Sequence, residues 1–187
     1  PVKNYLSYLR KVTSKYGTLL IFDEIITGFR LALGGAQEYF GVTPDMATLG
    51  KVLGGGFPLA AFGGRKEIMQ NVSPVGKVYQ AGTFSGNPVS ATAGFTILKL
   101  LTQKKNQIYP HLEKNAAELA NALKDIAEGY DLPAQVYNIA SMYQIFFTDT
   151  EVIDYACAKH SDPTMFNAYF KELLKQGVFI PPSQYET

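Results

Sequence analysis

The spacing of apolar residues in the first part of the chain predicts a helix followed by short strands. Apolar residues recur every three or four positions over 3–16, which predicts an amphipathic helix. The unbroken apolar run 19–22 predicts a strand buried on both faces of a parallel sheet, because such strands lack polar alternation. Two further apolar runs, 46–49 and 59–62, are bordered by glycines and predict two more strands.

The second part of the chain has a different pattern. Pro88 suits the first turn of a helix that ends near position 102, and the polar stretch 103–107 is expected to separate it from a second helix over 109–127. Alternating residues over 135–148 predict strands. Asp162, which precedes a proline, predicts the cap of a last helix.

These elements divide the chain into two expected domains. Residues 1–105 have the pattern of an α/β fold with glycine-rich loops, and residues 106–187 that of a smaller α+β unit. A chain of 187 residues is long enough to bury a sizeable core. It begins with Pro1 and shows no signal-peptide pattern, so we expect it to be a piece of a longer protein.

Composition narrows the possible functions. The formal net charge is +1, so the charge balance favours neither nucleic acid nor an anionic membrane as a partner. The single cysteine excludes an internal disulfide framework and fits a reducing compartment, and with only two distant histidines we expect no metal site. Charged residues make up 18% of the chain, below the usual quarter, which suggests that a partner buries part of the surface.

Two residues with distinctive chemistry follow the predicted strands, where functional groups of an open α/β sheet gather. Asp23 follows the first strand and is either an anionic partner for a buried cation or a turn cap, whereas Glu24 points to the opposite side. Lys51 follows the second strand, between apolar residues and three glycines. Apolar surroundings disfavour an ammonium ion and free the amine to form a Schiff base; the alternative is a solvated surface lysine.

A third candidate site lies in the loop before the first long helix. Gly82 and Thr83, with Ser85 and Asn87 after them, offer backbone N–H groups, hydroxyls and a helix N-terminus, which together favour an anion such as phosphate. An ordinary helix cap accounts for Ser85 and Asn87 but not for Gly82 and Thr83. The glycines at 54–56 match neither a P-loop nor a dinucleotide fingerprint.

A lysine nucleophile, an aspartate for a cation and a phosphate cradle together describe a pyridoxal-phosphate site. The segments 20–30, 44–51 and 54–56 resemble the signature of the class III aminotransferases. Within that family, four further segments resemble the glutamate-1-semialdehyde 2,1-aminomutases: residues 32–37, 61–65, 79–83 and 182–186.

The resemblance implies a fold-type I enzyme with a mostly parallel sheet, a smaller C-terminal domain and a homodimer. By position, Lys51 matches the lysine that bonds to pyridoxal 5'-phosphate and moves protons, and Asp23 matches the aspartate that pairs with the pyridinium nitrogen. Ile25 matches the apolar residue on one face of the ring. Gly82 and Thr83 match phosphate contacts that serve the neighbouring subunit's cofactor.

The same resemblance implies a reaction. An amino group is exchanged within glutamate 1-semialdehyde, the small-molecule substrate, through the pyridoxamine form of the cofactor, and 5-aminolevulinate is released for tetrapyrrole biosynthesis. Glu186 matches a carboxylate near the substrate amine, and Tyr79 is either a substrate contact or a packing aromatic. The implied location is the cytoplasm, or the plastid stroma if the source is a plant or an alga.

Two other functions stay open. One is a class III ω-aminotransferase with a separate amino donor and acceptor, and the other is a folding or dimerisation module without a cofactor. Compared with the family, residues 1–105 match the C-terminal part of the cofactor-binding large domain, and residues 106–187 match an incomplete small domain. The family's N-terminal half, with its own phosphate loop and substrate-carboxylate contacts, has no counterpart here, so we expect the isolated chain to be inactive.

Overall fold

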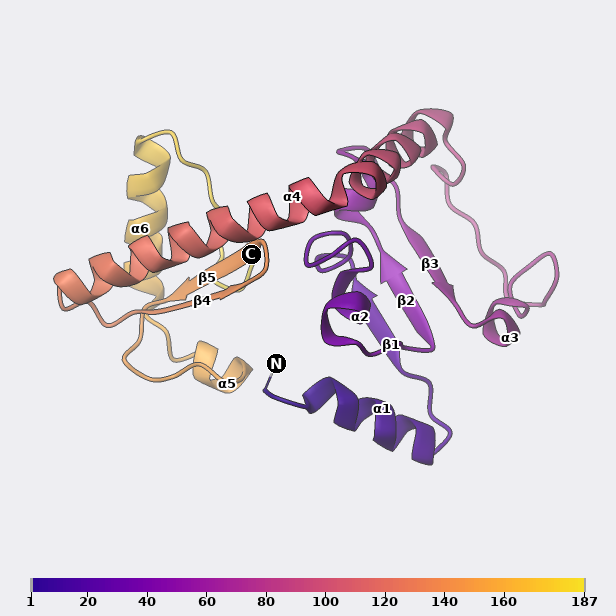
Figure 1. Ribbon diagram of the computed structural model, residues 1–187, viewed down its shortest axis with the longest axis horizontal. Coiled ribbons are helices and arrows are strands. Elements are labelled where there is room, and N and C mark those ends of the chain that lie inside the picture. Colours follow the sequence, from indigo (N-terminus) through magenta and orange to yellow (C-terminus); the bar gives the residue numbers. More distant parts are fainter. Residues whose placement is uncertain (1, 187) are drawn as a thin grey trace. The chain divides into compact units, whose positions relative to one another are not determined.

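The computed structural model describes residues 2–186, which form two compact units that meet in the sequence between Tyr109 and Pro110. The first unit contains a three-stranded sheet and the second a two-stranded sheet (Figure 1). Across residues 2–186, no helix is both long and apolar enough to cross a membrane.

The sheet of the first unit has the strand order β1 (Ile21–Glu24), β2 (Met46–Leu49), β3 (Ala61–Gly64). β1 and β2 are parallel, as the sequence predicts, whereas β3 runs antiparallel to β2. The position of β2 is confirmed, but β1 and β3 begin two residues later than the apolar runs that predict them. As a result, β1 includes Asp23 and Glu24 instead of ending before them.

The prediction that β1 is buried on both faces is wrong. Phe22 and Glu24 are buried, whereas Ile21 and Asp23 between and beside them are exposed. The apolar cluster with the first helix covers one face of β1, so the alternation of the pleat decides which side chains are buried. The buried cluster between the sheet and α1 (Tyr5–Lys15) consists of Leu20, Phe22, Val42 and Ala47, with Leu6 and Leu9 packed against it.

Short elements connect and follow these strands in the first unit: α2 (Gly35–Phe40), the 3₁₀ helix η1 (Lys51–Gly54) and α3 (Lys66–Met69). The helical stretch α4, Pro88–Gly129, consists of two helices that meet at a kink, where Lys104 has a non-helical backbone (φ −115°, ψ 16°). This kink lies within the polar stretch 103–107, so the two helices predicted from the sequence and the boundary between them are confirmed. The second helix begins directly after the kink, a few residues before the predicted start at 109.

The second unit contains the antiparallel pair β4 (Gln135–Ile139) and β5 (Met142–Phe146), and the helices α5 (Tyr155–Ala158) and α6 (Pro163–Lys175). Asp162 caps α6, as predicted, by accepting hydrogen bonds from Thr164 N at 2.7 Å and Met165 N at 3.2 Å. The core of the second unit comprises Ala120, Val136, Ile145, Phe147 and Phe166. Tyr169 packs against this core, and burial raises the pKa of its phenol to about 12.

Candidate active site

Asp23 lies near the carboxyl end of β1, on the exposed face of the strand. Its Oδ1 accepts two hydrogen bonds, one from the backbone N of Ile25 at 3.1 Å and one from Thr48 Oγ1 at 3.1 Å. The first is a local turn contact, whereas the second comes from the neighbouring strand, in which Thr48 is the register partner of Asp23. Both contacts use Oδ1, so neither consumes the second carboxylate oxygen, Oδ2.

Glu24 faces the other way, which confirms the prediction that the two acids do not act as a pair. Its side chain is only 1% exposed and accepts hydrogen bonds from Ala36 N at 2.6 Å, Gln37 N at 3.2 Å and Thr27 Oγ1 at 2.9 Å. The carboxylate thus binds the first turn of α2, where unpaired N–H groups favour an anion. This role was missed from the sequence, because it joins segments twelve or more residues apart.

Lys51 is the first residue of η1, two residues after β2 ends. Its side chain is exposed, so the predicted burial in an apolar loop is wrong; the buried positions of that turn are Leu53 and Gly54. The backbone of Lys51 has φ 44°, in the left-handed region, which costs a non-glycine residue about 1–3 kcal/mol. Strain of this kind persists mostly where the position of a side chain matters for function.

A hollow of about 910 Å³ lies over one end of the first unit's sheet. Ile25, Thr48, Gly82 and Thr83 line it, together with residues 58–62. The structure therefore brings together three of the predicted cofactor contacts, and Thr48 connects them to Asp23 by a hydrogen bond. An apolar wall, hydroxyls and backbone N–H groups around one space could hold a planar, phosphorylated cofactor.

Local backbone features shape this hollow. Gly50 is buried, and a β-carbon there would lie 2.9 Å from Ile25 Cδ1, so the glycine leaves room for that side chain. In the loop that carries Gly82 and Thr83, Gly82 O accepts a hydrogen bond from Ser85 N at 2.9 Å. Asn87 Oδ1 accepts from the first N–H groups of α4, which confirms it as the helix cap.

Two further predicted residues lie elsewhere. Tyr79 is 82% exposed, so its interpretation as a packing aromatic is wrong, and it lines a separate hollow of about 310 Å³ with Met46 and Phe62. Glu186 belongs to the second unit, where it is exposed and borders a small hollow lined by Tyr143 and Phe166. The substrate roles predicted for Tyr79 and Glu186 stay predictions.

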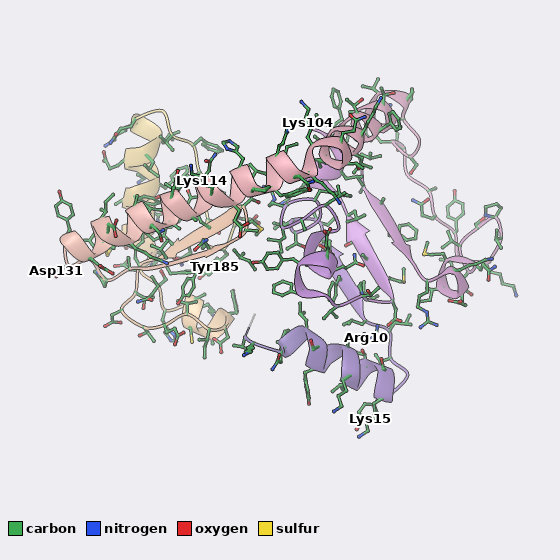
Figure 2. The ribbon with its side chains drawn as sticks, in the orientation of Figure 1. Arg10, Lys15, Lys104, Lys114, Asp131 and Tyr185 are labelled. Carbon is green, nitrogen blue, oxygen red and sulfur yellow. The ribbon has the colours of Figure 1, made fainter. Side chains whose placement is uncertain are left out.

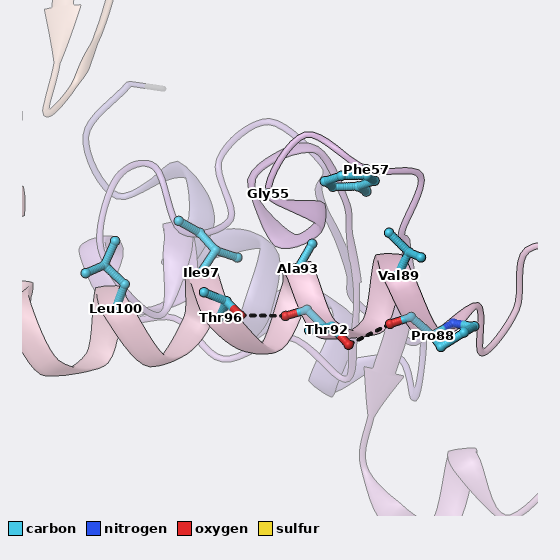
Figure 3. Close-up of a pocket in the computed structure, with 9 residues that line it drawn as sticks. All are labelled: Gly55, Phe57, Pro88, Val89, Thr92, Ala93, Thr96, Ile97 and Leu100. Atoms are coloured by element: carbon cyan, nitrogen blue, oxygen red, sulfur yellow. Dashed lines mark hydrogen bonds between the residues drawn. The ribbon is translucent and has the colours of Figure 1, made fainter.

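One more surface hollow contains none of the predicted site residues. An apolar hollow of about 690 Å³ lies along the first turns of α4, between Val89, Ile97 and Phe57 (Figure 3). Among residues 2–186, no group of three or more His, Cys, Asp or Glu side chains could hold a metal ion.

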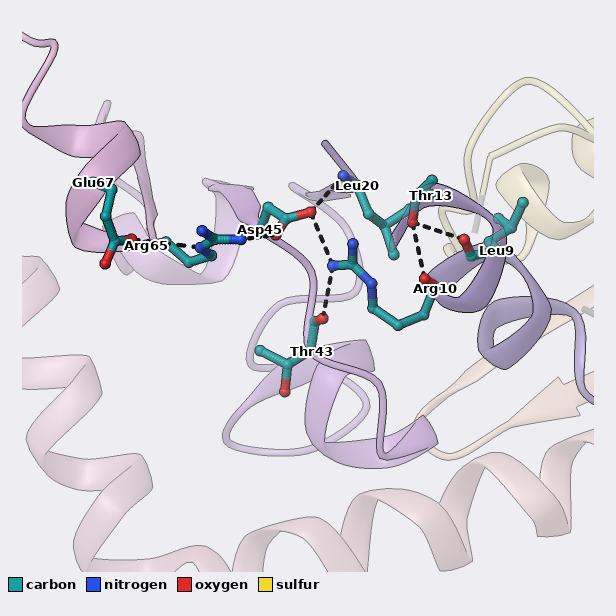
Figure 4. Close-up of polar contacts among 8 residues, drawn as sticks. All are labelled: Leu9, Arg10, Thr13, Leu20, Thr43, Asp45, Arg65 and Glu67. Carbon is teal, nitrogen blue, oxygen red and sulfur yellow. Dashed lines mark hydrogen bonds and ion pairs between the residues drawn. The ribbon is translucent and has the colours of Figure 1, made fainter. Parts of the chain in front are cut away.

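Asp45, just before β2, is a buried carboxylate that pairs with two more exposed arginines in one cluster (Figure 4). One of them, Arg10, extends from α1 (Figure 2). The side chain of Asp45 is 4% exposed, accepts from Leu20 N at 2.8 Å, and pairs with Arg10 at 2.9 Å and Arg65 at 3.0 Å. The Leu20 N–H, followed by the two guanidinium groups, holds the pKa of Asp45 below its ordinary value. Arg65 is thus an ion-pair partner of Asp45, and it also contacts Glu67 at 3.5 Å.

Comparison with known proteins shows which family this chain resembles. The family model for class III aminotransferases matches residues 1–186. Glutamate-1-semialdehyde 2,1-aminomutase from Methanocaldococcus jannaschii is 55% identical over 186 residues, which cover 100% of this chain and 43% of that protein. Glutamate-1-semialdehyde 2,1-aminomutase 2 from Brevibacillus brevis is 54% identical, with the same coverage of 100% and 43%. The chain thus spans less than half the length of these relatives.

A solved structure supports the same conclusion. An omega-transaminase from Sphaerobacter thermophilus matches with a TM-score of 0.86 and 33% sequence identity, over 96% of this chain and 41% of that one. This match confirms the predicted fold class, an α/β fragment of an aminotransferase. On the family match and the fold together, the chain belongs to the class III aminotransferase family.

Proposed function

We propose that the protein to which this chain belongs is a pyridoxal-phosphate-dependent aminomutase that converts glutamate 1-semialdehyde to 5-aminolevulinate for tetrapyrrole biosynthesis. The observation that carries the proposal is the hollow shared by Ile25, Thr48, Gly82 and Thr83, with Asp23 hydrogen-bonded to its wall. The choice of substrate is supported by relatives named for this reaction at 55% and 54% identity, compared with 33% for the omega-transaminase.

The residues around the hollow fit the parts of pyridoxal 5'-phosphate. Asp23 offers an oriented carboxylate to a basic ring nitrogen, and Ile25 offers an apolar surface to a flat ring. Gly82 and Thr83 offer an N–H and a hydroxyl to a phosphate, either that of this cofactor or that of a cofactor bound by a partner subunit. When bound, the cofactor supplies an electron sink for the substrate carbon that loses a proton.

Lys51 would perform the proton transfers. Its side chain is exposed on the turn that follows β2, and its amine would bond to the cofactor and then take a proton from one carbon and return it to another. The left-handed backbone at this residue fixes where the side chain leaves the turn. Because proton transfer needs close approach, an error of 1 Å in that position lowers the rate about a hundredfold.

We also propose a homodimer in which Gly82 and Thr83 serve the partner's cofactor. The motif resemblance supports this arrangement, as does the low charged fraction of the chain, 18%. In this chain the two residues share a hollow with Ile25, so the same donors are available to a cofactor bound within one chain.

The test uses the full-length protein loaded with pyridoxal phosphate and given glutamate 1-semialdehyde alone. Accumulation of 5-aminolevulinate without any added amino donor or acceptor is the expected result. Absence of product, with turnover once a separate donor and keto acceptor are supplied, would assign an ordinary ω-aminotransferase instead. Absence of cofactor binding would favour a non-catalytic module.

Two variants of the full-length protein test the residues. In Lys51→Ala, borohydride should no longer fix the cofactor to the protein, as measured by mass spectrometry, because the amine that forms the bond is missing. Asp23→Asn should keep that attachment but lower kcat by roughly two or more orders of magnitude, because the ring loses its anionic partner. Unchanged attachment in the first variant, or near-normal kcat in the second, would contradict the assigned roles.

A further inference from the structure

Thr48 is a polar residue of the hollow to which the proposed chemistry gives no role. It lies in β2 directly beside Asp23 of β1, and its Oγ1 donates a hydrogen bond of 3.1 Å to Asp23 Oδ1. Its neighbour Ala47 is buried in the cluster with Leu20 and Phe22. Because side chains alternate along a strand, Thr48 lies on the opposite face, the one that lines the hollow.

The hydrogen bond has a geometric consequence for Asp23. An aspartate carboxylate rotates easily about its last torsion angle, so its two oxygens exchange places unless a contact distinguishes them. The N–H of Ile25 belongs to the same turn as Asp23 and moves with it, whereas Thr48 belongs to the adjacent strand. The Thr48 hydroxyl therefore ties the carboxylate to the sheet itself.

We propose that Thr48 is a positioning residue, which holds Oδ1 of Asp23 so that Oδ2 is presented to the ring nitrogen of the cofactor. This inference rests on the proposed function, because it needs a cationic ring to receive Oδ2. The role needs a donor, since a carboxylate only accepts hydrogen bonds, and the hydroxyl of Thr48 supplies it. Thr48 also lies three residues before Lys51, so one segment positions both the anion and the nucleophile.

The test compares Thr48→Val, which keeps the shape, with Thr48→Ser, which keeps the hydroxyl, in the full-length protein loaded with pyridoxal phosphate. Thr13→Val is the matched control, because the Thr13 hydroxyl also donates a hydrogen bond, shared between Leu9 O at 2.8 Å and Arg10 O at 3.2 Å, but lies on α1 away from the hollow. The measurements are the dissociation constant of the cofactor, the pH dependence of its absorption spectrum, and kcat and KM separately.

We expect Thr48→Val to raise the cofactor dissociation constant by roughly tenfold or more, as for one hydrogen bond to a charged group, and to shift the pH midpoint of the spectrum. kcat should fall while KM for glutamate 1-semialdehyde stays unchanged. Thr48→Ser should lie close to the wild type, and Thr13→Val should match it. If valine prevents folding, as judged by circular dichroism, Thr48→Ala replaces it in the same comparison.

Three results would overturn the inference. An unchanged dissociation constant and pH midpoint in Thr48→Val would show that the hydroxyl does not orient Asp23. Equal losses in Thr48→Val and Thr48→Ser would assign Thr48 a packing role. Failure of the wild type to bind the cofactor would overturn the proposed function and this inference together, whereas the first two results leave the proposed function intact.

Discussion

Replacement of Gly35 by alanine should destabilise the protein chiefly through Glu24. Gly35 has φ +68°, and a β-carbon there would overlap with the Glu24 carboxylate. The left-handed backbone alone costs a non-glycine residue about 1–2 kcal/mol. Displacement of the carboxylate would also weaken its bonds to Ala36 N and Gln37 N, and hydrogen bonds to a charged group contribute about 1.5–3 kcal/mol each. The expected total for Gly35→Ala is about 4 kcal/mol.

Two variants separate these contributions. Gly41→Ala has the same left-handed backbone, φ +64°, but open space around the new methyl group, so it should cost only about 1 kcal/mol. In a Glu24→Ala background the overlap disappears, and Gly35→Ala should likewise cost only about 1 kcal/mol. The difference of about 3 kcal/mol between backgrounds measures the contact between Glu24 and α2.

The assay is urea-induced unfolding followed by circular dichroism, combined with amide hydrogen exchange of residues 25–40. Loss of the Glu24 contact should speed exchange at the start of α2 more than elsewhere. An equal destabilisation by Gly35→Ala with and without the Glu24 carboxylate would refute the reasoning. So would equal effects of Gly35→Ala and Gly41→Ala.

Two other predictions concern pH and assembly. Leu20 N–H and two arginines lower the pKa of Asp45, so the ionised carboxylate stabilises the folded state. This stabilisation is complete above the ordinary pKa of 3.8, and it is lost as pH falls through the lower pKa that Asp45 has in the folded state. Urea midpoints of Asp45→Asn should therefore depend less on pH between neutral and acid conditions than those of the wild type; equal dependence would contradict this. In the full-length protein, mixing Lys51→Ala with Thr83→Ala subunits should restore activity if Thr83 serves the partner's site, since each hybrid dimer then contains one intact site. No recovery after confirmed subunit exchange would place Thr83 in its own chain's site.

The local pattern of residues in the sequence was sufficient to predict several elements of the fold. β2, α1 and α6 lie where apolar spacing and capping residues predict them, because each depends on neighbours within a few positions. The cap at Asp162 is an example, since its acceptor serves N–H groups two and three residues on. The antiparallel direction of β3 was not predicted, because strand direction depends on the path of the connecting segment.

In the candidate site too, residues with a local sequence signal were predicted, whereas residues that depend on distant contacts were not. Asp23, Ile25, Gly82 and Thr83 were found because they follow strands or precede a helix, and motif resemblance gave them roles. Glu24 and Asp45 were missed as structural carboxylates, although both are almost fully buried. Apart from Thr27, their partners lie 12 to 35 positions away, and only the folded chain brings them together. The one signal in the sequence is an acidic residue next to the apolar run of a predicted strand, with no basic residue nearby; this pattern indicates a structural carboxylate.

The Asp45 cluster and the hollow occupy opposite ends of the same short sheet. Asp45 and Leu20 immediately precede β2 and β1, whereas Thr48 and Asp23 lie three residues further along each strand, about 10 Å away at ~3.3 Å per residue. Substitutions this far apart usually have additive effects on stability. Laboratory evolution could therefore vary the residues of the hollow to change the accepted amine or aldehyde, while a strengthened cluster at the other end supplies the stability that such changes consume.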